Sequence, residues 1–512
     1  ASNLITPLNA EQELAMRKQS FANANLPLPD AWDVEKNPWI GTTRTNWMDE
    51  VFRTAFFQRH NIVLNGGSET FTNRLSFNYV NNEGTLHNTY SKELGIRYNG
   101  SFKINKWVTI REDLTWKNYE SRTKSTTDAY TGPILSAIWM PASAEVYSPI
   151  TGTWGGTTTQ DPEYIAKYGS NFADAHGDVV NPIRLLECEN RYNRTSDIWT
   201  TTSLEIANII EGLRFTSRFT YNVANNNYSN FKPKDLAPGK PDENNSLLVS
   251  NYRTDQWNAE NTLTYENSFG QHRVSGLFSV TANHWEQRYL EGSGSGFEDE
   301  SKYLQYLPLA SSTTTSNALY GPDANVSLVA RVGYSYADRY FVTASWRRDL
   351  AGRLVKESNS GDFPAVTAAW KISSEKFFNN TNNFNLLKVR ASWGKVGNLG
   401  SVPMGYKAGL MWSDFVGNET AWYGIMNNQG GNKYFWGNMT GLSTPVNPNL
   451  TWETSEQFDI GVDAEFFHNR LAISLDYFDK KTNNLIQAQT INWPDYIGLS
   501  PQLVNLGEIS NR

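Results

Sequence analysis

Cysteine is almost absent from this 512-residue sequence, which contains only Cys188. A single thiol excludes an intramolecular disulfide and a site in which several thiolates bind a metal ion. Long apolar runs are also missing. No stretch approaches the roughly 18 residues of a membrane-spanning helix, and the mean hydropathy is −0.54. A helical membrane protein is therefore excluded.

An excess of positive charge and known catalytic motifs are lacking as well. The 45 Lys and Arg residues against 52 Asp and Glu residues give a net charge of −7, which argues against a broad nucleic-acid-binding surface. The six histidines are scattered without HExxH or another metal-ligand spacing, and no GxSxG or Walker motif occurs. We therefore expect no catalysis, no cofactor and no metal site.

Alternation of apolar and polar residues is the main pattern that is present. Between Leu328 and Trp346, one parity carries aliphatic and aromatic residues and the other mostly polar or small ones, on both sides of a turn at Ala337–Arg339. Successive side chains of a strand point to opposite faces, so this stretch predicts a β-hairpin. Its aliphatic residues lie in the middle and its aromatic rings at the ends, as expected of strands that face lipid.

The same alternation recurs along the chain and favours a barrel over a sandwich. It is visible around residues 62–79, 94–116, 213–221, 274–282, 387–393 and 458–477. In the last of these, Asp459, Asp463 and Glu465 share one face, and burying them in the dry core of a sandwich would be very costly. A wet barrel interior accommodates them. Glu112 falls on the apolar parity of its strand, which predicts either a β-bulge or a position near the lipid headgroups.

Short and long connections alternate between the predicted strands. Short ones occur near residues 105, 210–212, 270, 337–339 and 467–470, and long ones at about 119–194, 222–253, 286–325 and 398–455. Outer-membrane barrels have short periplasmic turns and long extracellular loops, and each crossing takes about ten residues. The sequence therefore predicts an all-β fold, a large antiparallel transmembrane β-barrel, with roughly fifteen or sixteen strands in this chain.

One helix is predicted, near the start of the chain. Asn9 and Gln12 have the spacing of a capping box, and the residues that follow are rich in helix formers. The Pro-rich stretch at 26–39 then ends this helix.

Several long motifs resemble one family of membrane proteins, the SusC-type (RagA/SusC-like) TonB-dependent outer-membrane transporters. The motifs are NWMDEVFRTAFFQRHNIVLNGGSE (46–69), LVARVGYSYADRYFVTASWRRD (328–349), DFPAVTAAWKISSEKFF (362–378), LLKVRASWGKVGN (386–398), NPNLTWETSEQFDIGVD (447–463) and NLGEISN (505–511). The resemblance implies a multi-pass barrel in the cell outer membrane, of the type with about 22 strands and a plug. It also implies active import of glycan or peptide oligomers, energised through TonB, beneath a SusD-like surface lipoprotein that acts as a lid.

The resemblance also implies a division of the chain. Residues 1–45 correspond to a linker between plug and barrel that contains the short helix, and residues 46–512 to the barrel. The plug, the TonB-contacting segment and the closing strands are expected outside this sequence.

Aromatic residues in the long connections are the candidate ligand-binding residues. Five lie in the connection 398–455 among several Asn and Gln residues, and two lie in the first long connection: Trp412, Trp422, Tyr423, Tyr434, Trp436, Trp139 and Trp154. Aromatic faces stack on sugar rings or peptide side chains, and amides bind hydroxyl or backbone groups. The alternative is that these rings pack the loops together or contact the lid.

Two smaller motifs and one alternative function remain. The glycines at 292, 294 and 296 form a GxGxG, which we interpret as a flexible loop because no helix pattern follows. The acidic run 298–300 is interpreted as a solvated loop rather than a cation site. A surface adhesin or glycan-binding β-protein without transport is the alternative to an importer, since aromatic loops alone would suit it.

Overall fold

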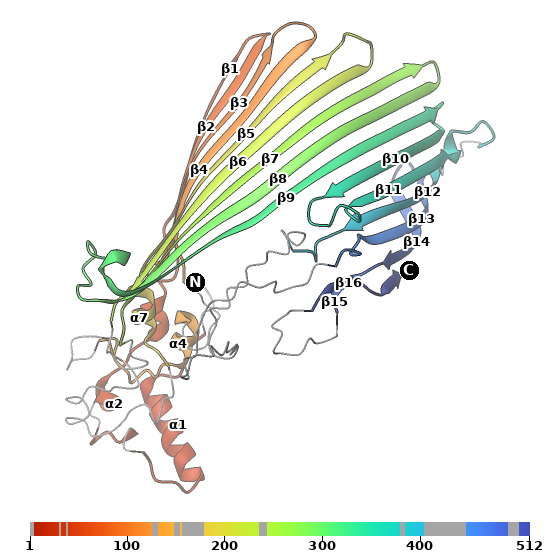
Figure 1. The fold of residues 1–512 in the computed structure, drawn as a ribbon. Coiled ribbons are helices and arrows are strands. Elements are labelled where there is room, and N and C mark those ends of the chain that lie inside the picture. Colours follow the sequence, from red (N-terminus) through yellow and green to blue (C-terminus); the bar gives the residue numbers. More distant parts are fainter. Residues whose placement is uncertain are drawn as a thin grey trace, which may run out of the picture.

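The fold is dominated by one large antiparallel sheet (Figure 1). The computed structural model describes residues 5–29, 32–36, 39–124, 132–147, 154–155, 179–234, 243–378, 384–403, 447–489 and 501–512. Within these residues, fifteen strands follow one another in chain order from β1 to β14 and then β17, while β15 and β16 form a separate pair. The predicted all-β antiparallel fold and the number of strands are confirmed.

The strands of the large sheet grow longer toward its middle and shorten again. Their bounds are β1 Phe57–Gly67, β2 Phe71–Glu83, β3 Tyr90–Lys103, β4 Val108–Arg122, β5 Asn190–Ala207, β6 Leu213–Lys232, β7 Ser246–Phe269, β8 His272–Phe297, β9 Ala310–Tyr336, β10 Tyr340–Ala351, β11 Ser360–Lys371, β12 Phe384–Asn398, β13 Glu453–Phe466, β14 Leu471–Asn483 and β17 Glu508–Asn511. The separate pair consists of β15 Ile486–Ala488 and β16 Leu503–Asn505.

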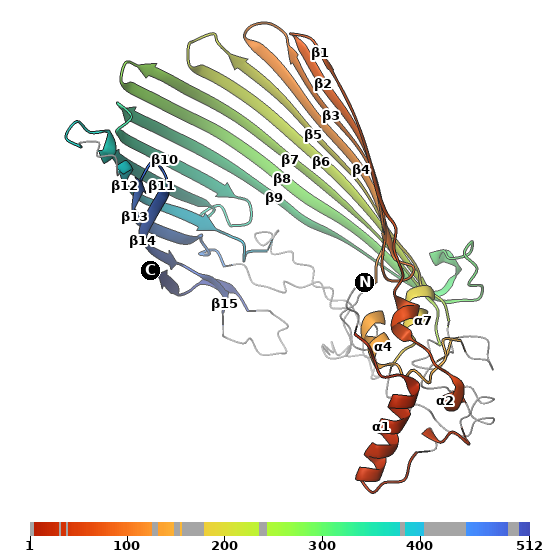
Figure 2. The same ribbon diagram turned by 180° about the vertical axis from the view of Figure 1, so that it is seen from behind.

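Short helices gather at one end of the sheet, and the short turns lie at the other (Figure 2). The helices are α1 Ala10–Asn23, α2 Trp39–Thr42, α3 Trp47–Val51, α4 Pro133–Trp139 and α7 Pro182–Glu187. The predicted capping box of α1 is confirmed, because Asn9 and Gln12 exchange backbone-to-side-chain hydrogen bonds of 2.9 and 3.1 Å. None of the helices in the described part of the chain is both long and apolar enough to cross a membrane.

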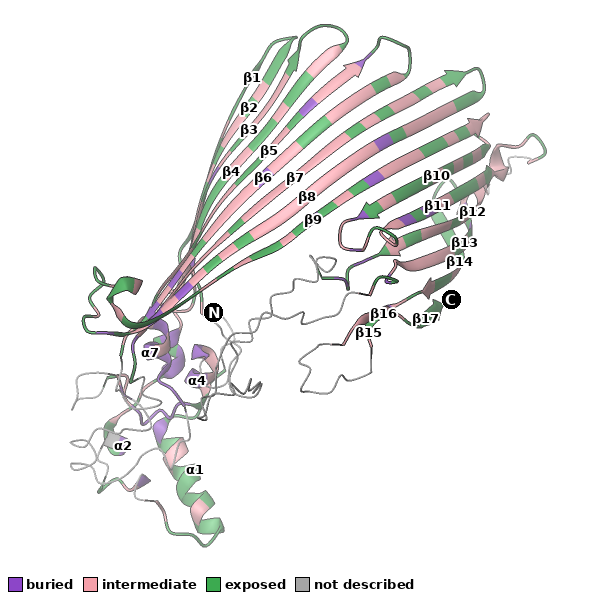
Figure 3. Ribbon diagram, in the orientation of Figure 1, coloured by how far each residue is buried: buried purple, intermediate pink, exposed green. Residues whose placement is uncertain are grey.

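The sequence patterns missed α3, α4 and α7. These helices have only five to seven residues, too few to be stable without tertiary packing. They form instead around a shared core in which Trp47, Met48 and Val51 of α3 meet Ala137 of α4 and Ile183 of α7. Figure 3 shows buried residues concentrated at this end of the molecule.

The large sheet has one apolar face and one polar face. Each face is continuous across the strands, because the register pairs apolar residues with apolar ones and polar residues with polar ones. On the apolar face, successive cross-strand partners from β8 to β14 are Val274, Tyr334, Val342, Ala368, Ala391, Ile460 and Tyr477. One residue along, the polar-face partners from β8 to β13 are Ser275, Gly333, Thr343, Thr367, Ser392 and Asp459. Five residues expected on the lipid-facing side are between 41% and 68% exposed, not in a dry core: Val332, Val342, Ile460, Ile473 and Leu475.

Aromatic rings line the short-turn end of the apolar face, as the hairpin pattern predicted. Tyr336 stacks near Tyr340, with ring centroids 6.5 Å apart, and Tyr340 near Trp370 at 6.4 Å. These rings flank the turn at Ala337–Arg339, where Ala337 and Asp338 both have φ of 52°. Such a row is the arrangement expected at a membrane–water boundary.

Glu112 lies on the apolar face without a β-bulge, so that explanation of its position is wrong. Its strand pairs with β3 and β5 in unbroken register around Gly100 and Thr202. The hydroxyls of Thr200 and Thr202 each donate a hydrogen bond of 2.5 Å to the carboxylate. The carboxylate of Glu112 is therefore hydrogen-bonded by side chains of the neighbouring strand β5.

Two connections predicted to be long loops are mostly strand. Residues 222–232 and 246–253 lie in β6 and β7, and residues 286–297 and 310–325 in β8 and β9; these four strands have 20 to 27 residues each. The GxGxG glycines lie inside β8 rather than in a flexible loop. A Cβ built on Gly292 would lie 2.4 Å from Leu307 Cδ1, so the missing side chain lets the turn Leu307–Leu309 pack on the strand.

Candidate functional site

A pocket of about 530 Å³ lies at the loop ends of β10 to β12 and midway along β8 and β9, and is the candidate ligand-binding site. We call it the loop-end pocket. Its polar wall includes Asn283, Asn325, Arg347 and Asp349, and its aromatic wall consists of Phe363 and Trp452. Asn283 and Asn325 are cross-strand partners of β8 and β9, and Asn325 is also opposite Ala351 of β10. Strand register therefore places these side chains together on the polar face.

Hydrogen bonds hold the polar wall in place. Asn325 Nδ2 donates to Asn283 Oδ1 at 3.1 Å. Arg347 Nε lies 2.8 Å from both carboxylate oxygens of Asp349, and its Nη2 donates to Ser327 Oγ at 3.2 Å. Each amide keeps further donor and acceptor positions for a ligand.

The aromatic wall depends on a glycine. The rings of Phe363 and Trp452 meet edge to face, with centroids 5.3 Å apart. A Cβ built on Gly397 would lie 2.2 Å from Phe363 Cζ and 2.8 Å from Trp452 Cε3. Any larger residue would push the rings away, so Gly397 allows them to cover the backbone of β12. Trp452 Nε1 also donates to the carbonyl of Asn359 at 3.2 Å, which sets the orientation of the indole.

The lining of the loop-end pocket suits the binding of sugars or peptides. Amides and an aromatic pair match the hydroxyls and apolar faces of sugars, or the backbone and side chains of peptides. In the part of the chain that the structure describes, no three His, Cys, Asp or Glu side chains form a metal-ligand set. In the acidic run 298–300, Glu300 Oε1 instead accepts hydrogen bonds of 2.7 Å from Lys234 N and Asn245 Nδ2.

Most of the predicted site residues lie outside the described part of the chain. These are Trp412, Trp422, Tyr423, Tyr434 and Trp436. The two others belong to the helical end and do not line the loop-end pocket. Trp139 is the last residue of α4 and half exposed. Trp154 stacks on Tyr147 with centroids 5.0 Å apart and packs against the helical core.

Sequence reasoning missed the residues of the loop-end pocket. Phe363 and Trp452 both lie in motifs that carry the family resemblance, but nothing local distinguishes them from aromatic residues that face lipid. Asn283 and Asn325 are separated by most of two long strands, so only their pairing shows that they meet. Finding these residues requires the register between neighbouring strands, and the alternation of apolar and polar residues does not give that register.

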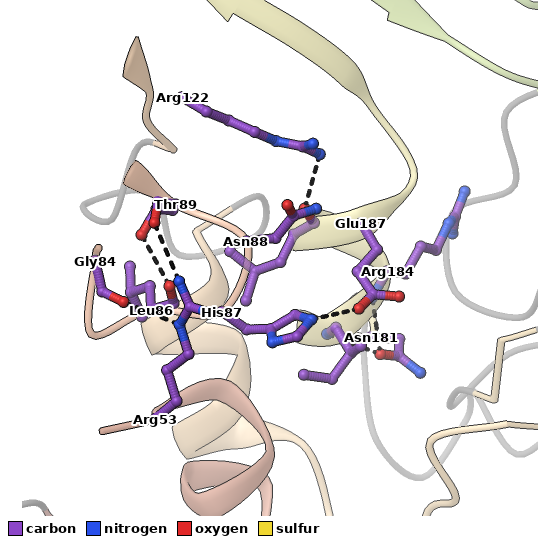
Figure 4. A network of polar contacts seen from close by, with 12 residues as sticks. Arg53, Gly84, Leu86, His87, Asn88, Thr89, Arg122, Asn181, Arg184 and Glu187 are labelled. Atoms are coloured by element: carbon purple, nitrogen blue, oxygen red, sulfur yellow. Dashed lines mark hydrogen bonds and ion pairs between the residues drawn. The ribbon is translucent and has the colours of Figure 1, made fainter. Parts of the chain in front are cut away.

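A polar network joins the helical end to the strands (Figure 4). His87 Nε2 lies 2.5 Å from Glu187 Oε1 of α7, and Asn88 Nδ2 donates to the carbonyl of Leu186 at 3.1 Å. Arg122, the last residue of β4, donates to the carbonyls of Leu186 and Glu189 at 3.2 and 2.6 Å. The β2–β3 connection and β4 thus fix the position of α7.

Asn181 connects three segments of the helical end. Its Oδ1 accepts the backbone N–H groups of Ile183 and Arg184, which caps α7. Its Nδ2 donates to the carbonyls of Val146 and Gly155 at 2.9 and 2.8 Å. Nearby, burial raises the pKa of Glu145 from about 4.5 to about 7, because an apolar environment disfavours the charged carboxylate.

Comparison with known proteins identifies related sequences. A family model described as "TonB dependent receptor-like, beta-barrel" matches residues 145–512. TonB-dependent receptor P3 of Formosa agariphila is 26% identical over 476 residues, which cover 92% of this chain and 44% of that protein. TonB-dependent receptor SusC of Bacteroides thetaiotaomicron is 24% identical over 503 residues, covering 92% of this chain and 45% of that protein. The chain thus spans slightly less than half the length of these relatives.

Among solved structures, this chain is similar in fold to the RagAB peptide transporter. The TM-score is 0.72 at 19% sequence identity, and the match covers 99% of this chain and 55% of that one. A second structure, of the RagAB peptide importer in its closed-closed state, gives a TM-score of 0.69 at 21% identity. At this level of identity the likeness concerns the fold alone.

Proposed function

This chain belongs to the TonB-dependent receptor-like β-barrel family, and we propose that it forms most of the barrel wall of an outer-membrane importer of oligomeric nutrients. The resemblance of its motifs to SusC-type transporters is confirmed by the relatives. In this proposal the apolar face contacts outer-membrane lipid, and the polar face lines the lumen through which glycan or peptide oligomers pass.

The division of the sheet into two faces is the observation that carries the proposal. The polar face holds charged groups in mutual contact, such as Arg390, which lies 3.1 Å from Asp463 and 2.6 Å from Asp476. The apolar face presents exposed aliphatic residues edged by aromatic rings. A water-soluble protein has no reason to expose an apolar surface of this extent, whereas a barrel wall in a membrane requires it.

The loop-end pocket is proposed to be the first ligand contact on the luminal side. It lies where β10 to β12 meet their longer connections, on the side that corresponds to the extracellular side of an outer-membrane barrel. A SusD-like surface lipoprotein is the proposed lid over this end, and TonB the proposed source of energy, through a region other than this chain. We propose no enzymatic activity. Family membership supports the importer over a non-transporting adhesin.

We further propose that residues 1–45 precede the barrel and that residues 46–512 belong to it. Contacts of the first segment lie at the helical end: Glu11 Oε1 pairs with Arg44 Nε at 2.8 Å, and Thr45 Oγ1 donates to the carbonyl of Ala144 at 2.6 Å. The contact of Thr45 with Ala144 supports the proposal that this segment rests on the first long connection.

Uptake by cells that produce the full-length protein tests the proposal. Labelled glycan and peptide oligomers are supplied at low concentration, with and without TonB. We expect TonB-dependent uptake of one class, while binding at the cell surface persists without TonB. Binding without TonB-dependent uptake of any oligomer would favour the adhesin.

The role of the loop-end pocket is tested in the same cells with a matched pair of variants. Phe363→Ala combined with Trp452→Ala is expected to reduce uptake at low concentration by about tenfold, since two aromatic contacts are lost. Trp393→Ala removes a ring on the apolar face and should leave uptake unchanged. Equal uptake by all three proteins would show that the loop-end pocket does not contact the ligand.

A further inference from the structure

The polar face of β1 to β4 contains a second pocket, of about 630 Å³, far along the sheet from the loop-end pocket. Its lining includes the cations Arg59, Arg74, Arg97 and Lys117 and a single carboxylate, Glu93. Register brings them together: Arg97 is the partner of Ser76 and Thr115, and Gly95 is the partner of Asn78 and Lys117. We call this group the basic pocket.

The four cations of the basic pocket form no ion pair within the described residues. Neither Arg74, Arg97 nor Lys117 has an ion pair or side-chain hydrogen bond there, and Arg59 only donates to Asn78 Oδ1 at 3.4 Å. Glu93 accepts from Asn78 Nδ2 at 3.2 Å rather than from a cation. On the same face of the neighbouring part of the sheet, Arg111 by contrast is paired with Glu205 at 3.0 Å.

Four cations and one carboxylate line the pocket, so an anion between the cations would reduce their mutual repulsion. Guanidinium groups bind carboxylate and sulfate oxygens through paired, charge-assisted hydrogen bonds. The side chains between the cations are neutral hydrogen-bonding groups, among them Asn61, Ser76 and Thr115, which suit sugar hydroxyls. Asn99 Nδ2 already donates to the carboxylate of Asp113. The chemistry of the lining therefore combines anion binding with hydroxyl binding.

An exposed tryptophan lies beside the basic pocket. Trp199 of β5 is the cross-strand partner of Thr115, which is itself opposite Arg97. The indole is 41% exposed, and its Nε1 donates to Asp197 Oδ2 at 2.8 Å, which leaves the ring faces free for stacking. A Trp ring on a polar wall is a platform for the apolar face of a sugar.

We propose that the basic pocket binds anionic oligosaccharides, whose sulfate or carboxylate groups contact Arg74 and Arg97 and whose rings stack on Trp199. This deepens the proposed import function, since it names the class of cargo. Acidic sugars are favoured over acidic peptides because hydroxyl-binding amides and an aromatic platform adjoin the cations.

Equilibrium binding to the purified full-length protein tests this assignment without requiring transport. The probes are oligosaccharides of matched length that carry sulfate groups, carboxylate groups or no charge, and an acidic peptide. We expect the two anionic sugars to bind most tightly, with affinity that falls as salt rises. Arg74→Gln combined with Arg97→Gln should weaken their binding by roughly tenfold or more and leave the neutral sugar unaffected.

Arg331→Gln is the control, because it removes a cation of the polar face outside both pockets. Heat-dependent mobility on gels verifies that each variant forms a barrel. Equal affinity for neutral and anionic sugars would overturn the proposal, as would preference for the acidic peptide. If the Arg74→Gln, Arg97→Gln variant lost thermal stability but kept its affinity for anionic sugars, the basic pocket would instead bind acidic residues of the protein itself. Loss of import with charge-selective binding intact would contradict only the proposed function.

Discussion

Arg353 binds Asp323 through two donors that share one carboxylate oxygen. Nη2 and Nε of Arg353 lie 2.7 and 3.1 Å from Asp323 Oδ2, and Asp323 is only 6% exposed. Arg353 Nη1 also donates to the carbonyl of Val402 at 3.1 Å. The pairing of β8 with β9 shifts register between Trp285 and Gln287, and Asp323 is the partner of Trp285 at this shift. The Arg353–Asp323 ion pair therefore joins the irregular part of β9 to the connections after β10 and β12.

Replacing Arg353 with Met is therefore expected to destabilise the loop end strongly. The variant leaves a buried carboxylate without its cation, which costs about 3–5 kcal/mol. Adding Asp323→Asn should recover part of this loss, because the neutral amide tolerates burial. Denaturant unfolding of the full-length protein measures the difference. Arg348→Met removes a largely exposed pair of 3.9 Å and should change stability by less than about 1 kcal/mol.

The two faces of β10 are expected to tolerate charge very differently. Val342→Lys places a cation on the apolar face between the rings of Tyr340 and Trp346, where a charge near the bilayer midplane costs about 2–4 kcal/mol. Thr343→Lys places the same cation on the polar face at almost no cost. Folding stability in lipid bilayers compares the two variants. Similar losses for both would contradict the assignment of the apolar face to lipid.

The aromatic cluster of the connection 398–455 stays a prediction. Replacing Trp422, Tyr423 and Trp436 with Ala should weaken import at low ligand concentration and leave barrel assembly intact, because each stacking contact contributes about 0.5–1.5 kcal/mol. If these rings contact the lid instead, the variant loses lipoprotein association and keeps its intrinsic ligand affinity. Co-purification of the lid and ligand binding are measured on the same variant. No change in either would assign the rings to loop packing.

The helical end is expected to be more stable in mild acid than at alkaline pH. The folded state raises the pKa of Glu145 to about 7 from about 4.5, so between these values it binds more protons than the unfolded segment. The stability of the segment therefore falls as pH rises from 4.5 to 7 and is constant above that. Hydrogen exchange of residues 132–147 at several pH values measures this. Glu145→Gln should abolish the pH dependence, and an unchanged profile would contradict the assignment.

The sequence by itself determined the hairpins of the sheet and the faces of their residues. Alternation has a period of two residues and is a local property, so the hairpins at 328–346 and 458–477 and their apolar parity could be predicted from neighbouring residues alone. The capping box at Asn9 is local for the same reason. The family also followed from the sequence, since its motifs are long and continuous.

Only the tertiary structure decided which side chains meet across the sheet. Glu112 is satisfied by Thr200 and Thr202, the aromatic wall needs Phe363, Gly397 and Trp452 together, and the basic pocket needs four strands in register. The extension of β6 to β9 through expected loops was likewise hidden, because cross-strand hydrogen bonds stabilise a strand whatever its composition. Each of these features depends on contacts between residues far apart in the chain, and a local pattern carries no information about such contacts.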